Sequence, residues 1–270
     1  MYGPDLYSTH DGGTSWQKVS LNGVPNSYGV TSLETNSTTT YLTAGNPNTA
    51  VPGADVLFSS PASQDNFTAL SQPAFTPGWE PRVIANPYGV VIAVNDNKGD
   101  LYFQPTGSTT WTHFNPDCLN GIPTNPLVAL ASPASGSSLP QIVLACGGDA
   151  GAGSQQKTIV KSSDLSTFAT APSNPPLGGI LGNIASPNGQ TIAVSASSGA
   201  TFLYVSSNGG SSWQTVINNP NFGGAQIHDL GFTTDTQGFA VEGDATKAGV
   251  VSSTFIMTRD AGLSWQTIAF

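Results

Sequence analysis

The stretch "PGWEPR", residues 77–82, sets Trp79, Glu80 and Arg82 close together in the sequence. An aromatic ring, a carboxylate and a guanidinium group can together bind a sugar or a peptide, and they can equally stack on one another as a local structural cluster. Trp79 is the one tryptophan that lies outside the repeated motifs of this chain. The stretch is therefore a candidate ligand-binding element.

Carboxylates offer a second kind of chemistry. Hydrolysis of a glycoside needs two carboxyl groups about 5–10 Å apart, one acting as acid and the other as base or nucleophile. The candidate carboxylates are Asp96, Asp149, Asp229, Glu242 and Asp244. His228 directly precedes Asp229 and is itself a candidate ligand-binding residue. Each candidate also has an ordinary interpretation as a solvated loop residue or a capped strand end.

The sequence contains no recognisable pattern for a metal or cofactor site. The histidines His10, His113 and His228 stand far apart, and no CxxC or HExxH pattern occurs. We therefore expect neither a metal nor a cofactor. Cys118 and Cys146 can form one disulfide or remain two partly buried thiols.

Charge and composition restrict the partners. Seven basic residues stand against 16 acidic ones, a formal net charge of −9, which is unsuited to nucleic acid. No run of about 18 apolar residues exists, so no membrane insertion is expected. Only 9% of residues are charged. This low charge, the abundant Ser, Thr and Asn and the possible disulfide favour an extracellular or cell-envelope location.

These residues must be positioned by a repeated element. Three segments are near copies: "STHDGGTSWQKV" (8–19), "VSSNGGSSWQTV" (205–216) and "MTRDAGLSWQTI" (257–268). Each has Ser or Thr, then Asp or Asn, then Gly, then Trp, at fixed spacing between strand-like runs. Asp or Asn followed by Gly predicts a hairpin turn, because the side chain accepts backbone hydrogen bonds and Gly adopts positive φ. We expect the Trp to bury its ring against the turn. The matching positions are Thr9, Asp11, Gly13, Trp16; Ser206, Asn208, Gly210, Trp213; and Thr258, Asp260, Gly262, Trp265.

This motif resembles the Asp-box, or BNR repeat, of sialidase-like and sortilin-like β-propellers. In that family the box is a structural turn between the two outer strands of a blade, away from the functional face. The resemblance implies that the box carboxylates stabilise turns and that a ligand binds on the opposite loop face. The nine candidates, from Trp79 to Asp244, belong to that face.

Weaker copies of the motif end at Phe67, Trp111 and Phe168, so an aromatic anchor recurs every 44 to 57 residues. A four-stranded propeller blade has such a period. The chain is thus predicted to be an all-β propeller of four-stranded antiparallel blades in a single domain, 1–270. Five full blades are expected at about 28–70, 80–114, 126–171, 179–217 and 225–270, after a two-stranded remnant at 1–20.

Six outer hairpins but only five inner strand pairs can be identified, because "MYGPDLYSTHDGG" begins close to a third strand. We expect a parent protein that extends upstream, has six or seven blades and is a monomer when complete.

The function that the sequence favours is a non-catalytic binding or scaffold propeller for a glycan or protein ligand. Sortilin-like and photosystem II assembly factor-like propellers are examples. A glycoside hydrolase is the alternative. Sialidase activity is disfavoured, because that family uses three arginines and this chain has only Arg82 and Arg259.

Overall fold

The computed structural model describes residues 5–21, 29–45, 56–73, 81–94, 99–116, 118, 126–220, 226–244 and 252–269. The chain divides into two compact units, Met1–Pro116 and Asp117–Phe270. All regular structure in the described ranges is β-strand.

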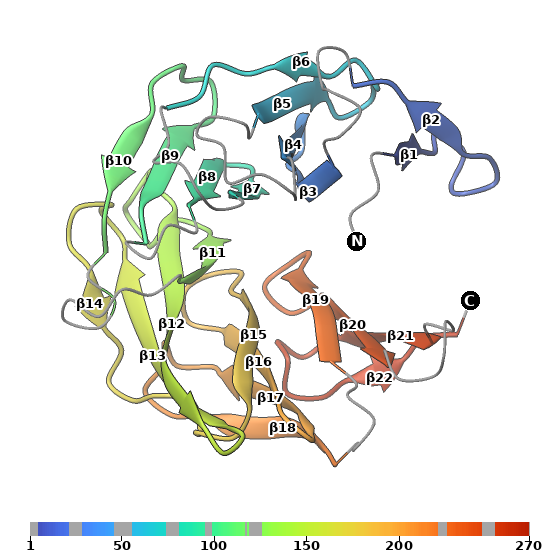
Figure 1. Ribbon diagram of the computed structural model, residues 1–270. Helices are drawn as coiled ribbons and strands as arrows, with labels where there is room; N and C mark the ends of the chain where they lie inside the picture. The colour runs from blue at the N-terminus through green and yellow to red at the C-terminus, as the bar shows by residue number, and fades with distance from the viewer. Residues whose placement is uncertain are drawn as a thin grey trace. The chain divides into compact units, whose positions relative to one another are not determined.

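The first unit holds one two-stranded and two four-stranded sheets (Figure 1). The two-stranded sheet pairs β1 (Leu6–Ser8) with β2 (Gln17–Val19). The next sheet has the order β3-β4-β5-β6 and the third has the order β7-β8-β9-β10. Their bounds are β3 Gly29–Thr35, β4 Thr39–Gly45, β5 Val56–Pro61, β6 Thr68–Ala69, β7 Arg82–Asn86, β8 Gly89–Ala93, β9 Leu101–Pro105 and β10 Thr112–Phe114.

The second unit holds three four-stranded sheets, each of four strands consecutive in the sequence (Figure 1). Their bounds are β11 Leu127–Ala131, β12 Gln141–Gly151, β13 Ser154–Ser162, β14 Ala169–Thr170; β15 Ile180–Ala185, β16 Ile192–Ser197, β17 Thr201–Ser206, β18 Gln214–Asn219; and β19 Gln226–Phe232, β20 Gly238–Asp244, β21 Ser252–Thr258, β22 Gln266–Thr267.

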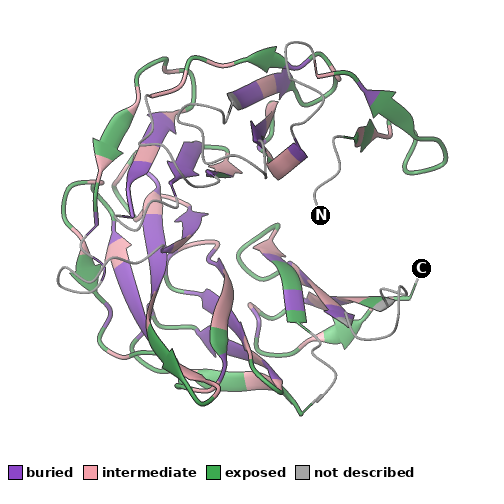
Figure 2. Ribbon diagram, viewed as in Figure 1, coloured by how far each residue is buried: buried purple, intermediate pink, exposed green. Residues whose placement is uncertain are grey.

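All neighbouring strands within the sheets are antiparallel, so each four-stranded sheet is a simple meander. The predicted all-β architecture of five four-stranded blades and a two-stranded N-terminal sheet is confirmed. The middle strands β8 and β16 are almost wholly buried, whereas the fourth strands β10 and β18 are mostly exposed (Figure 2).

The core of each unit lies between successive sheets. In the first unit Val19 packs with Leu42 and Phe58, which joins the two-stranded sheet to its neighbour. In the second unit Val143 and Val194 belong to one cluster between two sheets. An apolar face on each side of a sheet therefore requires a neighbouring sheet to cover it.

Each sheet has two distinct ends. The turn edge carries the connections between first and second and between third and fourth strands, and these turns bond to each other, as in Gly209 N to Gln190 O (2.8 Å). The loop edge carries the remaining connections, where Gly179 N donates to Gly153 O (3.0 Å). The three copies of the sequence repeat lie at the turn edge, and those candidate binding residues that the structure describes lie at the loop edge.

The three repeated turns share one hydrogen-bond network. In the last turn Thr258 Oγ1 donates to Asp260 Oδ1 (2.8 Å) and accepts from Gly262 N (2.9 Å). Ser264 donates to the same carboxylate through its backbone N (2.9 Å) and its hydroxyl (2.6 Å). Equivalent bonds recur around Asp11 and Asn208, except that Asn208 Nδ2 donates to the Ser212 hydroxyl instead of accepting from it.

The glycine of the repeat is required by its backbone. Gly13, Gly210 and Gly262 have φ near +90°, which a side chain would strain. A Cβ on Gly210 would also lie 2.6 Å from the Ala171 Cβ. The hydrogen bonds from Ser15 and Thr9 lower the pKa of Asp11 to about 2. The repeated acidic side chains are therefore engaged within their own turns.

The expectation of buried tryptophans was wrong in degree. Trp16 is 62% exposed and the other repeat tryptophans are half-buried. Trp111 and Trp213 instead donate their indole N–H groups to Ser71 O (3.0 Å) and Ser173 O (3.2 Å), which follow the fourth strand of the preceding sheet. These rings therefore link neighbouring sheets at the surface of each unit.

A second expectation also fails. Residues 147–157 lie between the second and third strands of the blade predicted at about 126–171, where a propeller blade would ordinarily have a loop, but β12 and β13 continue through them to a two-residue turn with positive φ at Ala152 and Gly153. A register shift between Gly147 and Ala150 marks a bulge in this extension. The hairpin arm, residues 147–157, therefore extends from the loop edge as a defined β-structure.

Candidate functional site

The "PGWEPR" stretch stays a prediction. Trp79, Glu80 and Asp96 lie outside the described residues, and so does the side chain of Asp244. Arg82 is described, and it is exposed at the first position of β7, at the loop edge. The arrangement of Arg82 with the neighbouring aromatic and acidic groups is therefore not part of the described site.

The loop edge of the same sheet holds a polar cluster that the sequence interpretation missed. Asp100, buried at the entrance to β9, accepts hydrogen bonds from His113 Nε2 (3.0 Å) and Asn115 Nδ2 (2.9 Å). The His113 ring stacks on Tyr102 with centroids 4.8 Å apart. A carboxylate thus orients a half-exposed imidazole, which is able to bind a polar ligand group. Only the cross-strand register that sets His113 opposite Tyr102 would have indicated this cluster.

In the second unit, His228, Asp229 and Glu242 lie at the loop edge of the last sheet. Asp229 Oδ1 accepts from Leu230 N (2.8 Å), and Glu242 has a long contact of 3.5 Å with Asn219 Nδ2. The His228 ring is exposed at the bulge in this strand pair.

The strand register separates the two carboxylates. Asp229 pairs with Val241, whereas Glu242 pairs with Ile227. Directly opposed residues share a face of the sheet and adjacent residues alternate, so the Asp229 and Glu242 side chains leave opposite faces. These two groups are not arranged as the acid and base of a glycosidase.

The most strongly organised part of the described loop edge surrounds Lys157. This lysine of β13 is fully buried, and the three N–H groups of its ammonium are shared among four backbone carbonyls within hydrogen-bond distance: Gln155 O (3.0 Å), Pro176 O (3.1 Å), Leu177 O (2.9 Å) and Gly178 O (2.9 Å). Three of these acceptors are consecutive in the connection from β14 to β15. We call the four carbonyls with the ammonium group the Lys157 cage.

Tyr204 completes the cage. Its hydroxyl donates to Gly178 O (2.9 Å), and its ring centroid lies 5.7 Å from Lys157 Nζ. Burial lowers the pKa of Lys157 to about 8 and raises the pKa of Tyr204 to about 12. A Cβ on Gly178 would lie 2.9 Å from the Tyr204 hydroxyl oxygen, so the chain approaches the ring closely here.

A disulfide holds the base of the same region. Cys118 and Cys146 are bonded and both are buried, so residue 118 is fixed to β12 where the hairpin arm begins. Asp149 lies exposed on this arm. The loop edge of the second unit thus combines a covalent link, a buried cation and an exposed carboxylate.

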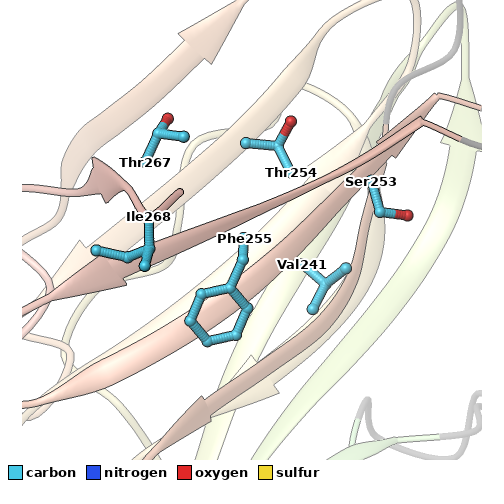
Figure 3. A pocket seen from close by; sticks show the side chains of 6 residues that line it. All are labelled: Val241, Ser253, Thr254, Phe255, Thr267 and Ile268. Carbon is cyan, nitrogen blue, oxygen red and sulfur yellow. The ribbon is translucent and has the colours of Figure 1, made fainter. Parts of the chain in front are cut away.

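One hollow of about 480 Å³ lies on β20, β21 and β22 (Figure 3). Val241, Phe255 and Ile268 point to one side of the sheet, and Thr254 and Thr267 point to the other. None of the residues that line it is titratable, so it offers no acid or base; Ser253 completes the lining. This hollow is lined by three apolar and three hydroxyl-bearing side chains and offers no titratable group for catalysis.

Across the described ranges no group of three or more His, Cys, Asp or Glu side chains is placed to hold a metal ion. The same ranges contain no helix long and apolar enough to cross a membrane.

No protein-family model and no curated protein sequence matches this chain. Solved structures do match. YCF48 bound to a D1 peptide gives a TM-score of 0.57 at 14% identity over 97% of this chain and 74% of that one. YCF48 from Cyanidioschyzon merolae gives the same score and identity over 97% and 77%.

The β-propeller domain of the Trilobed protease from Pyrococcus furiosus, described as having an open velcro topology, gives a TM-score of 0.56 at 11% identity. It covers 95% of this chain and 70% of that one. Such similarity shows the fold alone, which is a β-propeller like that of YCF48. The predicted propeller fold is thereby confirmed.

Proposed function

We propose that this chain is a non-catalytic binding propeller that holds a segment of a protein partner at its loop edges. The observation that carries the proposal is the Lys157 cage. It fixes the backbone of a surface connection with a buried charge, and a fixed connection lowers the entropic cost of binding.

A protein partner is favoured over a glycan. The solved structure of YCF48 with a D1 peptide supports peptide binding by a propeller of this fold. The opposite faces of Asp229 and Glu242 count against the hydrolase alternative.

The repeated turns are proposed to be structural. Their Asp and Asn side chains are occupied by hydrogen bonds within the turn, as those of Asp260 are. We also propose an extracellular or cell-envelope location, which the Cys118–Cys146 disulfide supports because such bonds persist in oxidising compartments.

The test uses the purified chain in three assays: binding to random peptides displayed on phage, binding to a glycan array, and hydrolysis of aryl glycosides. We expect peptide binding that survives Asp260→Asn at the turn edge, and no turnover. Turnover that disappears in Asp149→Asn or Glu242→Gln would overturn the proposal. Glycan binding without peptide binding would overturn the choice of partner.

A further inference from the structure

The connection between β14 and β15 presents apolar side chains to solvent. Its sequence at 175–180 is Pro-Pro-Leu-Gly-Gly-Ile. Leu177 is 60% exposed, Ile180 is 37% exposed and Pro176 is also exposed. We call Pro176, Leu177 and Ile180 the Leu177 ridge.

The backbone beneath the ridge is tied on both sides. Leu177 O accepts from Lys157 Nζ (2.9 Å) and from Gln155 N (2.9 Å). Gly179, at φ +74°, donates to Gly153 O, and a Cβ on it would lie 2.8 Å from the Ala196 Cβ. These contacts hold the ridge backbone against the hairpin arm and β16.

Fixing this backbone does not bury the Leu177 side chain against its own chain, because that side chain is 60% exposed. Fixing the backbone of a residue has an entropic cost, and burying the Lys157 ammonium group adds a desolvation cost. Single exposed apolar residues are common, but here two of them, with an exposed proline, stand within five residues on a fixed backbone. A rigid apolar anchor is the kind of residue that dominates a protein interface.

The side chain of Gln155 bridges the segment after the ridge and the backbone next to Asp149. Its side-chain oxygen accepts from Leu181 N (2.8 Å), and its side-chain N–H donates to Gly148 O (2.9 Å). Asp149, exposed on the arm, is the next residue. In the described part of the second unit, the exposed charged groups at the loop edge are the carboxylates of Asp149 and Asp229, and the half-buried Glu242 adds a third carboxylate.

We infer that the Leu177 ridge and Asp149 together bind an extended peptide segment of a protein partner, one that carries an apolar side chain and a Lys or Arg. The apolar side chain packs on Leu177, and the cation is attracted by Asp149 within a chain of net charge −9. This inference rests on the proposed function and narrows it to one surface and one partner chemistry.

The probe is a library of random dodecapeptides displayed on phage and selected on the full 270-residue chain. Affinities of the selected peptides are then measured by calorimetry. Leu177→Asp should weaken binding at least about tenfold, as the loss of an interface anchor does. Leu263→Asp is the matched control, because Leu263 is 45% exposed but lies in a repeated turn at the opposite edge. It should change affinity less than about twofold.

The charge requirement has its own variant. Asp149→Lys should weaken the selected peptides and strengthen versions in which their Lys or Arg is replaced by Glu. Thermal unfolding establishes whether each variant is folded. If Leu177→Asp does not fold, Leu177→Ser replaces it in the binding measurement. Selection of acidic peptides would overturn the predicted charge of the partner.

The outcomes separate the two proposals. Binding that tolerates Leu177→Asp but is lost in Arg82→Ala or Asp229→Asn would overturn the ridge and leave loop-edge protein binding intact. Failure to select any peptide, or equal loss in Leu177→Asp and Leu263→Asp, would overturn both.

Discussion

Replacing Lys157 with methionine removes a buried ammonium group and keeps most of the side chain's length. Burial lowers the pKa of Lys157 to about 8 in the folded chain, against 10.5 for an ordinary lysine. The unfolded chain therefore binds more protons between pH 8 and 10.5, and stability rises with pH across that window. From these two pKa values, the wild-type chain should gain on the order of 2 kcal/mol over Lys157→Met between pH 7.5 and 9.5.

The four carbonyls of the Lys157 cage act in the opposite direction. Hydrogen bonds to the charged form favour it, whereas desolvation disfavours it. At pH 7.5 the variant escapes a charge penalty of about 3 kcal/mol but leaves Gln155 O and Pro176 O without this donor, at about 1–3 kcal/mol each. The two effects are similar in size, so the free energy of unfolding at a single pH does not show whether burial or the carbonyls dominate. The dependence of that free energy on pH does show it.

The assay is urea unfolding followed by tryptophan fluorescence at pH 7.5, 8.5 and 9.5. Subtracting the variant from the wild type cancels groups common to both chains. Lys18→Met is the control, because Lys18 is exposed and its bond to Asp5 raises its pKa above 10.5, so the difference between wild type and this variant should stay nearly flat from pH 7.5 to 9.5. A wild-type advantage that stays flat or shrinks with rising pH would refute the reasoning, because the carbonyls would then outweigh burial.

Three further predictions follow from the turns, the tryptophans and the disulfide. Bonds from Ser264 lower the pKa of Asp260, so its turn loses stability as pH falls below the ordinary value of 3.8. Asp260→Asn should keep the turn, as Asn208 does natively, and should make the urea midpoint depend less on pH between pH 6 and 2.5. An unchanged acid response would contradict this. Trp213→Ala should cost about 2–3 kcal/mol in chemical unfolding, below the range for a fully buried ring, and Trp16→Ala should cost far less because that ring is 62% exposed; equal costs would contradict the linking role. Removing the disulfide by Cys118→Ser should cost about 3–4 kcal/mol for a sequence separation of 28, and the wild type in dithiothreitol should match the variant.

The architecture was predictable because it is repeated. Three copies of one turn, flanked by alternating strands, indicate both the local hairpin and the blade period. The local chemistry of Asp260 and Gly262 follows from residue type alone. The burial of the tryptophans does not, because exposure depends on what the neighbouring sheet places over the ring, as at Trp16 and Trp213.

The candidate site was less predictable. Sequence reasoning selected groups by their side-chain chemistry, and of these Arg82, Asp149, His228, Asp229 and Glu242 are described at the loop edge. It missed Asp100 with His113, which are brought together only by strand register. Asp229 and Glu242 are sent to opposite faces of their sheet by strand register, whereas Asp100 and His113, which have the same separation in the sequence, are brought into contact by it.

Lys157 was missed for a different reason. In "SQQKTIV" it has the appearance of a polar residue on the solvent face of a strand, and its acceptors come from residues about twenty positions later. Those acceptors are backbone carbonyls, which every residue has, so no residue type signals them. A buried cation held by carbonyls fixes the course of a connection without fixing the side chains that the connection displays. The residue at position 177 can therefore be replaced to suit a partner while the Lys157 cage beneath it stays the same. In this fold, a binding surface is best sought where hydrogen bonds fix the backbone of a surface connection that does not contribute side chains to the core.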